Sequence, residues 1–274
     1  MRCRSRYDWD QKRGSGTGWV QVARGREPYR RGAMLSAGRV ALPRDLKPTT
    51  NYLQFRMKIE WLGRIGYADG LVIQERHLQN CLATGEERIL LLEHEPVYTI
   101  GRLLDKSSLG EVSRLPHPVY ETNRGGQATY HGPGQLVGYL ILDLRKRGRD
   151  LHVYMRTIEA ILIDLLGRFG IDASRIEGKT GVWVQNRKIA SIGVGVRKWI
   201  TMHGFALNVA RDMTGFASIT PCGIVGVQMT AMSVEAGRDV PLDEVRREIE
   251  PLFERHLGVG ERLGPAALSG RVAV

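Results

Sequence analysis

Two short segments of this chain carry the side chains best suited to covalent chemistry. Residues 188–193 (KIASIG) begin with Lys188, and residues 220–224 (TPCGI) contain Cys222, 34 positions later. A cysteine thiolate is a nucleophile that can accept an acyl group, and a neighbouring amine can give and take the protons that such a reaction moves. The two segments therefore predict an enzyme, if the fold brings the two side chains together.

Each of these residues also has an ordinary interpretation. Cys222 lies between Pro221 and Gly223, outside any apolar repeat, which predicts a tight and exposed turn. Cys81 falls on the apolar face of a predicted helix, so we expect it to be a buried structural thiol. Lys188 taken alone is typical of an exposed lysine at a hairpin, and only contact with Cys222 would give it a role in proton transfer. Spacing alone does not show that contact.

A glycine-rich segment, residues 124–135 (RGGQATYHGPGQ), precedes both. Its glycines let the main chain approach a ligand closely, and their N–H groups can face a carbonyl or an oxyanion. Arg124 would add a fixed charge and His131 a hydrogen-bond donor, although an ordinary loop is the alternative. His131, His203 and Cys222 form no compact ligand pair in the sequence, so no metal site is expected.

The net charge of +11 is concentrated near the N-terminus. Residues 1–56 hold thirteen Lys and Arg against four Asp and Glu, which is +9, so residues 57–274 carry only +2. A basic nucleic-acid-binding module is therefore disfavoured, because the body of the chain lacks a basic stripe interleaved with aromatic residues. We interpret residues 1–56 as a basic, disordered extension, with Met57 or Met34 as an alternative start.

Three further sequence features that the chain lacks exclude other classes of protein. The three cysteines form no CxxC pair, which favours a reducing compartment, and we expect a cytoplasmic protein. The sequence has no apolar run of the roughly 20 residues that a membrane helix needs, so no membrane association is expected. It also lacks the glycine patterns of dinucleotide-binding and P-loop proteins, so nothing indicates a nucleotide cofactor.

Hydrophobic periodicity predicts alternating strands and helices after residue 57. Helices are expected over residues 67–83, 151–170 and 243–257, the second having Gly170 as its cap. Strands are expected over residues 58–62, 88–93, 97–102, 119–122, 136–142, 181–185, 188–197 and 203–209, with a hairpin turn at residues 186–187. This order predicts an α+β fold with a mixed or largely antiparallel sheet. We expect one catalytic domain over residues 57–257 and a loosely ordered tail over residues 258–274.

Four segments in this order resemble the octanoyl-[acyl-carrier-protein]:protein transferase family of lipoate biosynthesis; they are residues 124–135, 188–193, 203–209 and 221–224. The resemblance covers roughly residues 57–257. It implies a biotin/lipoate-protein-ligase-type α/β catalytic domain with a larger mixed β-sheet and a smaller subdomain. It also implies that Cys222 is the acyl-thioester nucleophile and that Lys188 activates this thiol and moves protons.

The resemblance further implies a pocket for the acyl chain and two protein substrates. Carried over residue by residue, the pocket would be lined by Arg124, Gly125, Gly126, Gln127, Ala128, Thr129, Tyr130, His131, Ser191, Ile192, Gly193, Gly204, Phe205 and Ala206. The donor would be octanoyl-acyl carrier protein, which holds the acyl group on phosphopantetheine. The acceptors would be lipoyl domains and the glycine-cleavage H protein, and neither ATP nor a metal would be needed.

Three alternatives within the same fold stay open at this point. An ATP-dependent lipoate ligase would activate a free acid and would not need Cys222. An amidotransferase that moves octanoyl groups between carrier proteins would use a cysteine as well. A catalytically inactive relative is a third alternative, although the intact Cys222 and Lys188 argue against it.

Overall fold

The computed structural model describes residues 57–103 and 105–258 of the chain. The predicted basic extension over residues 1–56 therefore lies outside the described residues. The predicted tail does too, except for Gly258.

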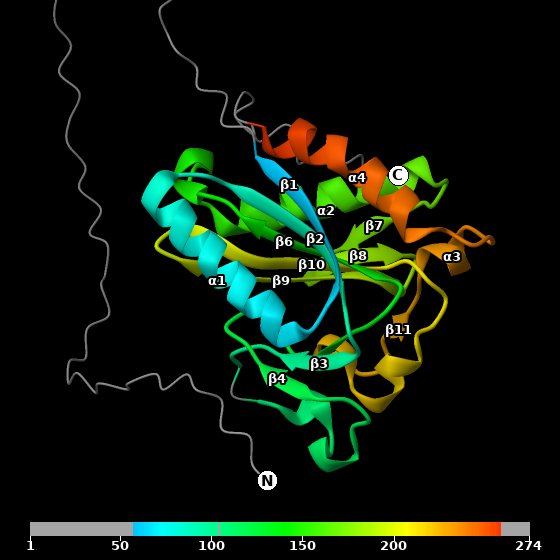
Figure 1. The fold of residues 1–274 in the computed structure, drawn as a ribbon. Helices are drawn as coiled ribbons and strands as arrows, with labels where there is room; N and C mark the ends of the chain where they lie inside the picture. Colours follow the sequence, from blue (N-terminus) through cyan, green and yellow to red (C-terminus); the bar gives the residue numbers. More distant parts are fainter. Residues whose placement is uncertain (1–56, 104, 259–274) are drawn as a thin grey trace, which may run out of the picture. The chain divides into compact units, whose positions relative to one another are not determined.

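An eight-stranded mixed sheet forms the centre of the described chain (Figure 1). Its strands run in the order β1-β2-β6-β10-β9-β8-β7, and β11 pairs with β9 outside this path. The β1–β2 and β9–β11 pairs are parallel, whereas the others are antiparallel. The strands are β1 Lys58–Ile65, β2 Arg88–His94, β6 Gln135–Ile141, β7 Ser174–Ile176, β8 Lys179–Val184, β9 Arg187–Arg197, β10 Ile200–Asn208 and β11 Gln228–Met229.

The central strands of this sheet are buried on both faces. In β2, Ile89 and Leu91 enter one apolar cluster and the alternating Leu90 and Leu92 enter another on the opposite face. Side chains in a strand point to opposite faces in turn, so a continuous apolar run is what a strand covered on both sides requires. Helices therefore cover both faces of the sheet.

Three long helices provide this cover, α1 Tyr67–Thr84, α2 Leu151–Arg168 and α4 Leu242–Leu257. The α1 helix packs on β6 and β10 through Leu78 and Cys81, while α2 and α4 pack against each other over the other face (Figure 1). The α2 helix begins where the Asp150 carboxylate accepts hydrogen bonds from the N–H groups of His152 and Val153. A short helix, α3 Met232–Glu235, follows β11.

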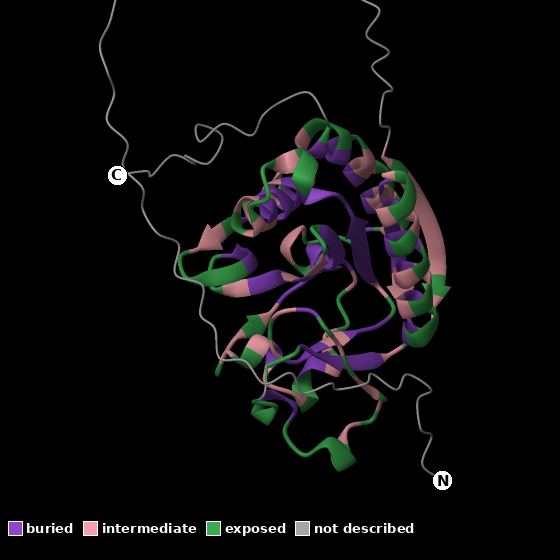
Figure 2. Ribbon diagram, turned by 90° about the vertical axis from the view of Figure 1, so that its left-hand side faces the viewer, coloured by how far each residue is buried: buried purple, intermediate pink, exposed green. Residues whose placement is uncertain are grey.

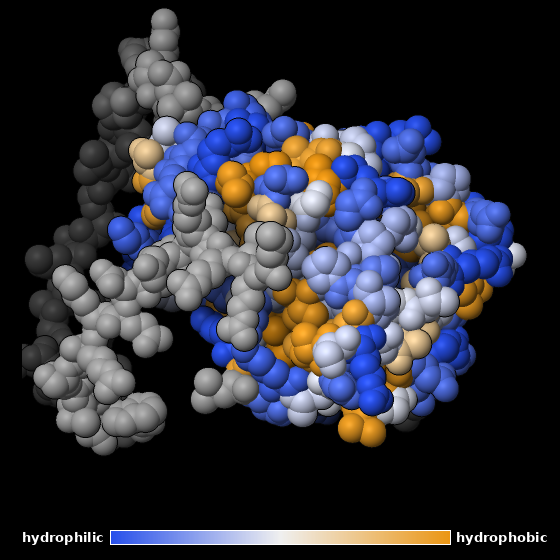
Figure 3. Space-filling model, turned by 60° about the horizontal axis from the view of Figure 1, so that its bottom comes forward, coloured by the Kyte–Doolittle hydropathy of each residue, from blue (hydrophilic) through white to orange (hydrophobic). Residues whose placement is uncertain are grey.

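A second, three-stranded sheet forms the smaller subdomain, with strand order β4-β3-β5. It consists of β3 Val97–Ile100, β4 Val119–Glu121 and β5 Thr129–His131. Tyr98, Ile100, Leu109 and Ala128 form its small core. Buried residues, purple in Figure 2, follow the strands of both sheets and the inner sides of the helices. On the face that Figure 3 shows, apolar side chains gather in patches between hydrophilic ones.

The predicted helices and long strands are found at their predicted places, with ends that move by a few residues. The short strands β5, β7 and β11 were not predicted. The hairpin turn before β9 lies at Gln185 and Asn186, one residue earlier than predicted, and Gln185 adopts a positive φ of 53°. In the described part of the chain, no helix has both the length and the apolar character needed to cross a bilayer.

Candidate active site

Cys222 lies on a strained turn between the two sheets. The turn is a single 3₁₀ turn over Pro221–Gly223, and Cys222 adopts the left-handed conformation, with φ 57° and ψ 13°. A side chain with a Cβ rarely adopts this conformation, and such strain is concentrated at functional positions. The Cys222 N–H donates a hydrogen bond of 2.8 Å to the carbonyl of Ala128, which fixes the turn against the segment leading into β5.

Lys188 reaches the Cys222 thiol from the large sheet. Its Nζ lies 3.0 Å from Cys222 Sγ, although its side chain begins on β9 and only 3% of the residue is exposed. The Trp183 ring of β8 lies beneath it, with 5.2 Å between Nζ and the ring centroid. On the other side, Thr230 N–H donates to the Lys188 carbonyl at 2.9 Å. The contact that the spacing could not show is therefore present.

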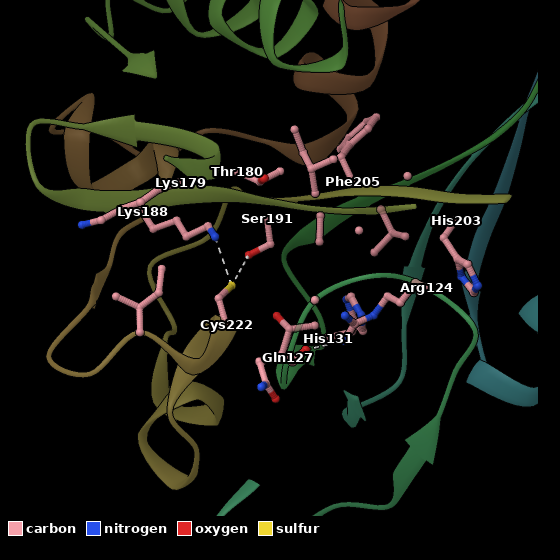
Figure 4. A pocket seen from close by; sticks show the side chains of 18 of the residues that line it. Arg124, Gln127, His131, Lys179, Thr180, Lys188, Ser191, His203, Phe205 and Cys222 are labelled. Atoms are coloured by element: carbon pink, nitrogen blue, oxygen red, sulfur yellow. Dashed lines mark hydrogen bonds between the residues drawn. The ribbon is translucent and has the colours of Figure 1, made fainter. Parts of the chain in front are cut away.

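Ser191 is the third polar group at the thiol. Its Oγ lies 3.6 Å from Cys222 Sγ, and it comes from the same strand as Lys188, three residues later (Figure 4). An amine and a hydroxyl therefore both face the sulfur. This arrangement is chemically equipped for attack on an electrophilic carbonyl and for the accompanying proton transfers.

A cavity of about 320 Å³ extends from this thiol. Cys222 and Ile224 are partly exposed, whereas Tyr139 and His203 are almost fully buried. Figure 4 shows Cys222 and His203 at opposite sides of the cavity. Most of the predicted site residues line it, namely Arg124, Gly126, Gln127, Thr129, His131, Lys188, Ser191, Ile192, Gly193, Gly204, Phe205, Ala206 and Cys222.

Three predicted pocket residues lie outside the lining. The Gly125 N–H donates to Val194 O at 2.9 Å, and the Ala128 carbonyl accepts the hydrogen bond from the Cys222 N–H. Tyr130 packs instead against the rings of Tyr98 and Phe216. These residues support the wall from behind, because neighbouring side chains of an extended segment point to opposite sides.

The Arg124 guanidinium holds the glycine-rich segment in shape. Its Nη2 donates to the carbonyls of Thr99 at 2.9 Å and Gln127 at 3.0 Å, and its Nη1 donates to Gly125 O at 2.9 Å. Gly193 on β9 permits the close approach of this loop, because a Cβ there would lie 3.1 Å from Arg124 Cδ. Arg124 thus both lines the cavity and fixes the loop that closes it.

The inner end of the cavity is built from aromatic and imidazole rings. His94 Nδ1 donates to Ile65 O at 3.0 Å, and its Nε2 accepts from the Tyr139 hydroxyl at 2.5 Å. Burial lowers the pKa of His94 to about 4. Burial, together with His94 nearby, lowers the pKa of His131 to about 3. Both rings are therefore neutral at physiological pH.

His203 completes this end and has a strained backbone, with φ 58° inside β10. Its N–H donates to Gln74 Oε1 at 2.8 Å, and its Nε2 donates to Asn123 Oδ1 at 2.5 Å. Burial, followed by the nearby Arg124, lowers the pKa of His203 to about 3. Burial also raises the pKa of Tyr67, another lining residue, to about 12.

Eight lining residues were missed from the sequence, namely Tyr67, Val137, Tyr139, Gly178, Lys179, Thr180, His203 and Ile224. Tyr139 and Val137 lie in an apolar strand, where an aromatic residue is typical of a core. His203 and Ile224 lie inside segments that carry the family resemblance, but only Gly204, Phe205, Ala206 and Cys222 of those segments were predicted to belong to the site. Gly178, Lys179 and Thr180 carried no comparable signal.

Curated relatives cover most of the chain at high identity. An octanoyltransferase from Geobacter sulfurreducens is 50% identical over 198 residues, which is 72% of this chain and 83% of that protein. An octanoyltransferase from Solibacter usitatus is 45% identical over 212 residues, covering 75% of this chain and 96% of that protein. Residues 66–254 match the family model described as the lipoyl protein ligase A/B catalytic domain.

Solved structures share the fold at low sequence identity. A lipoate-protein ligase A bound with ATP has a TM-score of 0.62 at 18% identity, covering 73% of this chain and 85% of that one. A bipartite lipoate protein ligase from Thermoplasma acidophilum has a TM-score of 0.59 at 18% identity, with 73% and 83% covered. This likeness shows that the ligase-type fold predicted from the sequence is present. The chain thus belongs to the lipoyl protein ligase A/B catalytic domain family and, within it, to the octanoyltransferases.

Proposed function

We propose that this octanoyltransferase moves an octanoyl group from octanoyl-acyl carrier protein to a lysine of a lipoyl domain or glycine-cleavage H protein, through a thioester on Cys222. The observation that carries the proposal is the 3.0 Å contact between Lys188 Nζ and Cys222 Sγ in the lining of the cavity. A ligase that forms an acyl adenylate would have no use for a thiol paired with an amine.

In the first step the Cys222 thiolate attacks the carbonyl of the donor thioester. The carbon–sulfur bond to phosphopantetheine breaks, and the Lys188 ammonium protonates the departing thiolate. The octanoyl group is then held on Cys222 as a thioester, and Lys188 is neutral. This step exchanges one thioester for another, so it is close to neutral in free energy.

In the second step the neutral ε-amine of the acceptor lysine attacks the same carbonyl. Lys188, left neutral by the first step, takes the proton that this amine loses, and the Cys222 thiolate departs. An amide replaces a thioester, so the step is downhill and needs no ATP, and no metal takes part. The starting ion pair is restored.

The oxyanion that forms in each step needs hydrogen-bond donors. The N–H groups of Cys222 and Gly223 are committed to the carbonyls of Ala128 and Thr220, at 2.8 Å and 3.0 Å. The donors nearest the sulfur are therefore the Lys188 ammonium and the Ser191 hydroxyl. We propose that these two groups stabilise the charge that develops on the oxygen.

The octanoyl chain would extend from Cys222 toward the buried end of the cavity. Ile192, Phe205 and Val137 give this path an apolar lining. Each CH₂ group that leaves water there contributes about 0.8 kcal/mol to binding. The lining rings of His131 and His203 are neutral, and the Arg124 guanidinium beside them donates to the carbonyls of the loop, so this end suits an uncharged chain.

The test is the intact mass of the full chain after brief incubation with octanoyl-acyl carrier protein. We expect one octanoyl adduct, located at Cys222 by peptide mapping and discharged when a lipoyl domain is added. If no adduct forms, and the lipoyl domain is modified only when ATP and free octanoate are supplied, the protein is a ligase instead.

A further inference from the structure

Glu159, on helix α2, is a buried carboxylate outside the cavity with an unusual set of partners. Only 1% of the residue is exposed. Its Oε2 accepts from Arg156 Nη1 at 2.7 Å and from Arg175 Nε at 3.0 Å. Its Oε1 accepts from the main-chain N–H of Gly181 at 3.1 Å. Two arginines suffice to balance its charge, so the bond to the main chain of β8 needs a separate explanation.

Gly181 is the point where β8 touches the Lys188 side chain. Its φ is 121°, and a Cβ placed on it would lie 2.7 Å from Lys188 Cε and 2.6 Å from Ala190 O. The lysine stem therefore runs directly over the Gly181 main chain. Two residues later, the Trp183 ring lies 5.2 Å from Lys188 Nζ. Gly181 and Trp183 together form the surface on which this side chain rests.

The pairing of β8 with β9 does not hold Gly181 in place. The register between the two strands shifts between Val182 and Trp183, where Val182 faces Ala190 and Trp183 faces Lys188. Gly181 precedes this irregular step, and its N–H is directed to Glu159 instead of to β9. A buried N–H must be satisfied, so the position of Gly181 depends on the carboxylate that accepts from it.

We propose that Glu159 is a positioning residue for Lys188: by binding the Gly181 N–H, it fixes the part of β8 on which the lysine rests and so sets the distance from Nζ to the Cys222 thiol. The inference builds on the proposed function, in which Lys188 serves Cys222. Its consequence is that a residue without contact to the cavity controls how readily the thiol reacts.

The alternative is that Glu159 has a purely structural role and does not position Lys188. Glu159 also joins α2 to β7 through Arg175, so its loss would lower stability in either case. Arg156 provides the matched control, because it contacts the same carboxylate without touching Gly181. A structural role predicts that Glu159 and Arg156 variants differ only in stability. The positioning role predicts that only Glu159 variants change the chemistry of Cys222.

The experiment measures the second-order rate of Cys222 alkylation by iodoacetamide from pH 6 to pH 10 in the full chain, with peptide mapping to identify the thiol. We expect Glu159→Ala to slow alkylation about tenfold at pH 7 and to move the midpoint of the pH profile upward, the direction also expected for Lys188→Ala. Arg156→Ala should keep the wild-type profile while losing stability in urea. A folded Glu159→Ala with the wild-type profile would overturn the proposal.

Two further variants keep the test decisive if Glu159→Ala does not fold. Glu159→Asp keeps the charge but withdraws the carboxylate from Gly181 by about one bond length, ~1.5 Å. In Gly181→Ala, the added methyl group would lie 2.7 Å from Lys188 Cε and so displace the lysine side chain directly. We expect both to shift the profile in the same direction as Glu159→Ala, and wild-type profiles in both would refute the positioning role. Alkylation involves no octanoyl donor, so a failure of octanoyl transfer with these shifts intact would count against the proposed function alone.

Discussion

Both ends of the cavity carry polar side chains, but these side chains differ in their contact partners and in their burial. At the outer end, Lys188 Nζ and Ser191 Oγ lie 3.0 Å and 3.6 Å from the Cys222 sulfur, which is partly exposed. At the inner end, His94 and Tyr139 bond to each other at 2.5 Å and are almost fully buried. The outer groups are directed at the partly exposed thiol, whereas the inner ones are directed at each other.

The difference shows how burial assigns roles to titratable groups. Histidine is the usual proton carrier near neutral pH, yet burial lowers the pKa of His94 to about 4 and of His203 to about 3. Both rings stay neutral; His203 lines the cavity, and His94 holds the hydroxyl of the lining residue Tyr139 from behind. In the proposed mechanism proton transfer falls to a lysine, because Lys188 is the amine that contacts the Cys222 thiol.

The largest effect should come from removing the nucleophile at the outer end. Cys222→Ala should abolish the octanoyl adduct and lower transfer by at least about 10⁴-fold. Cys81→Ala is the control, since Cys81 is fully buried in α1 and burial raises its pKa to about 11. Transfer rates from octanoyl-acyl carrier protein measure both. Equal losses in the two variants would remove the distinction between a reactive and a structural thiol.

A smaller loss is expected when the amine is removed but the thiol stays. Lys188→Ala should slow acylation of Cys222 by about 10²-fold near pH 7, because the thiol then lacks a cation and a proton donor. The deficit should shrink at alkaline pH, where solvent deprotonates the thiol. Single-turnover rates across pH measure this, with Lys58→Ala on the exposed β1 edge as control. A deficit that is the same at every pH would exclude activation of the thiol by charge.

The inner end should control stability in acid. His94, His131 and His203 have folded-state pKa values of about 4, 3 and 3, below the unfolded value of about 6.5. Their contribution is complete above pH 6.5 and is lost as the pH falls toward 4 and 3, because the unfolded chain then binds more protons. Each histidine adds about 1.4 kcal/mol per pH unit to the slope of the unfolding free energy against pH. This is about a tenfold change in the folding constant per pH unit.

The variant His94→Gln tests this acid dependence, because it removes one of the three histidines that bind a proton on unfolding. The slope of unfolding free energy against pH, from urea titrations between pH 6 and pH 5, should fall by about 1.4 kcal/mol per pH unit. His152→Gln, at an exposed position in α2, is the matched control. An unchanged slope for His94→Gln would mean that the ring is not held neutral.

The smallest effect is expected at Ser191. Ser191→Ala removes a hydroxyl 3.6 Å from the sulfur but leaves the ammonium in place, so transfer should slow only about threefold to tenfold. Steady-state kinetics should show this in kcat with KM nearly unchanged. A loss as large as that of Lys188→Ala would make the serine an equal partner in stabilising the oxyanion.

The sequence predicted the outer end of the cavity far better than the inner one. Lys188 and Cys222 lie in segments that carry the family resemblance, and this resemblance predicted their roles, whereas their contact across 34 positions was not visible in the sequence. Tyr139 and Tyr67 lie in an apolar strand and at the start of a helix, where aromatic residues are common. Only the packing of α1 against β6 brings them together, and local patterns do not report on such packing.

The same limit explains the elements that were missed. The β5 strand has three residues, Thr129–His131, inside a segment whose glycines indicate a loop. The β11 strand has two residues, and it forms because the chain returns beside β9 after the turn that carries Cys222. Strands this short have no periodicity to detect, so they are defined by their partners. Long elements such as α2 carry their own signal.

The contact between Cys222 and Lys188 joins the two sheets, which has a consequence for inactivation. Cys222 is tied by its N–H to Ala128, next to the small sheet, whereas Lys188 belongs to β9 of the large one. Loosening of the smaller subdomain would therefore separate thiol from amine while the large sheet stays intact. Heat or mild denaturant should therefore abolish activity before the large sheet unfolds. Activity would then report on the position of one sheet relative to the other.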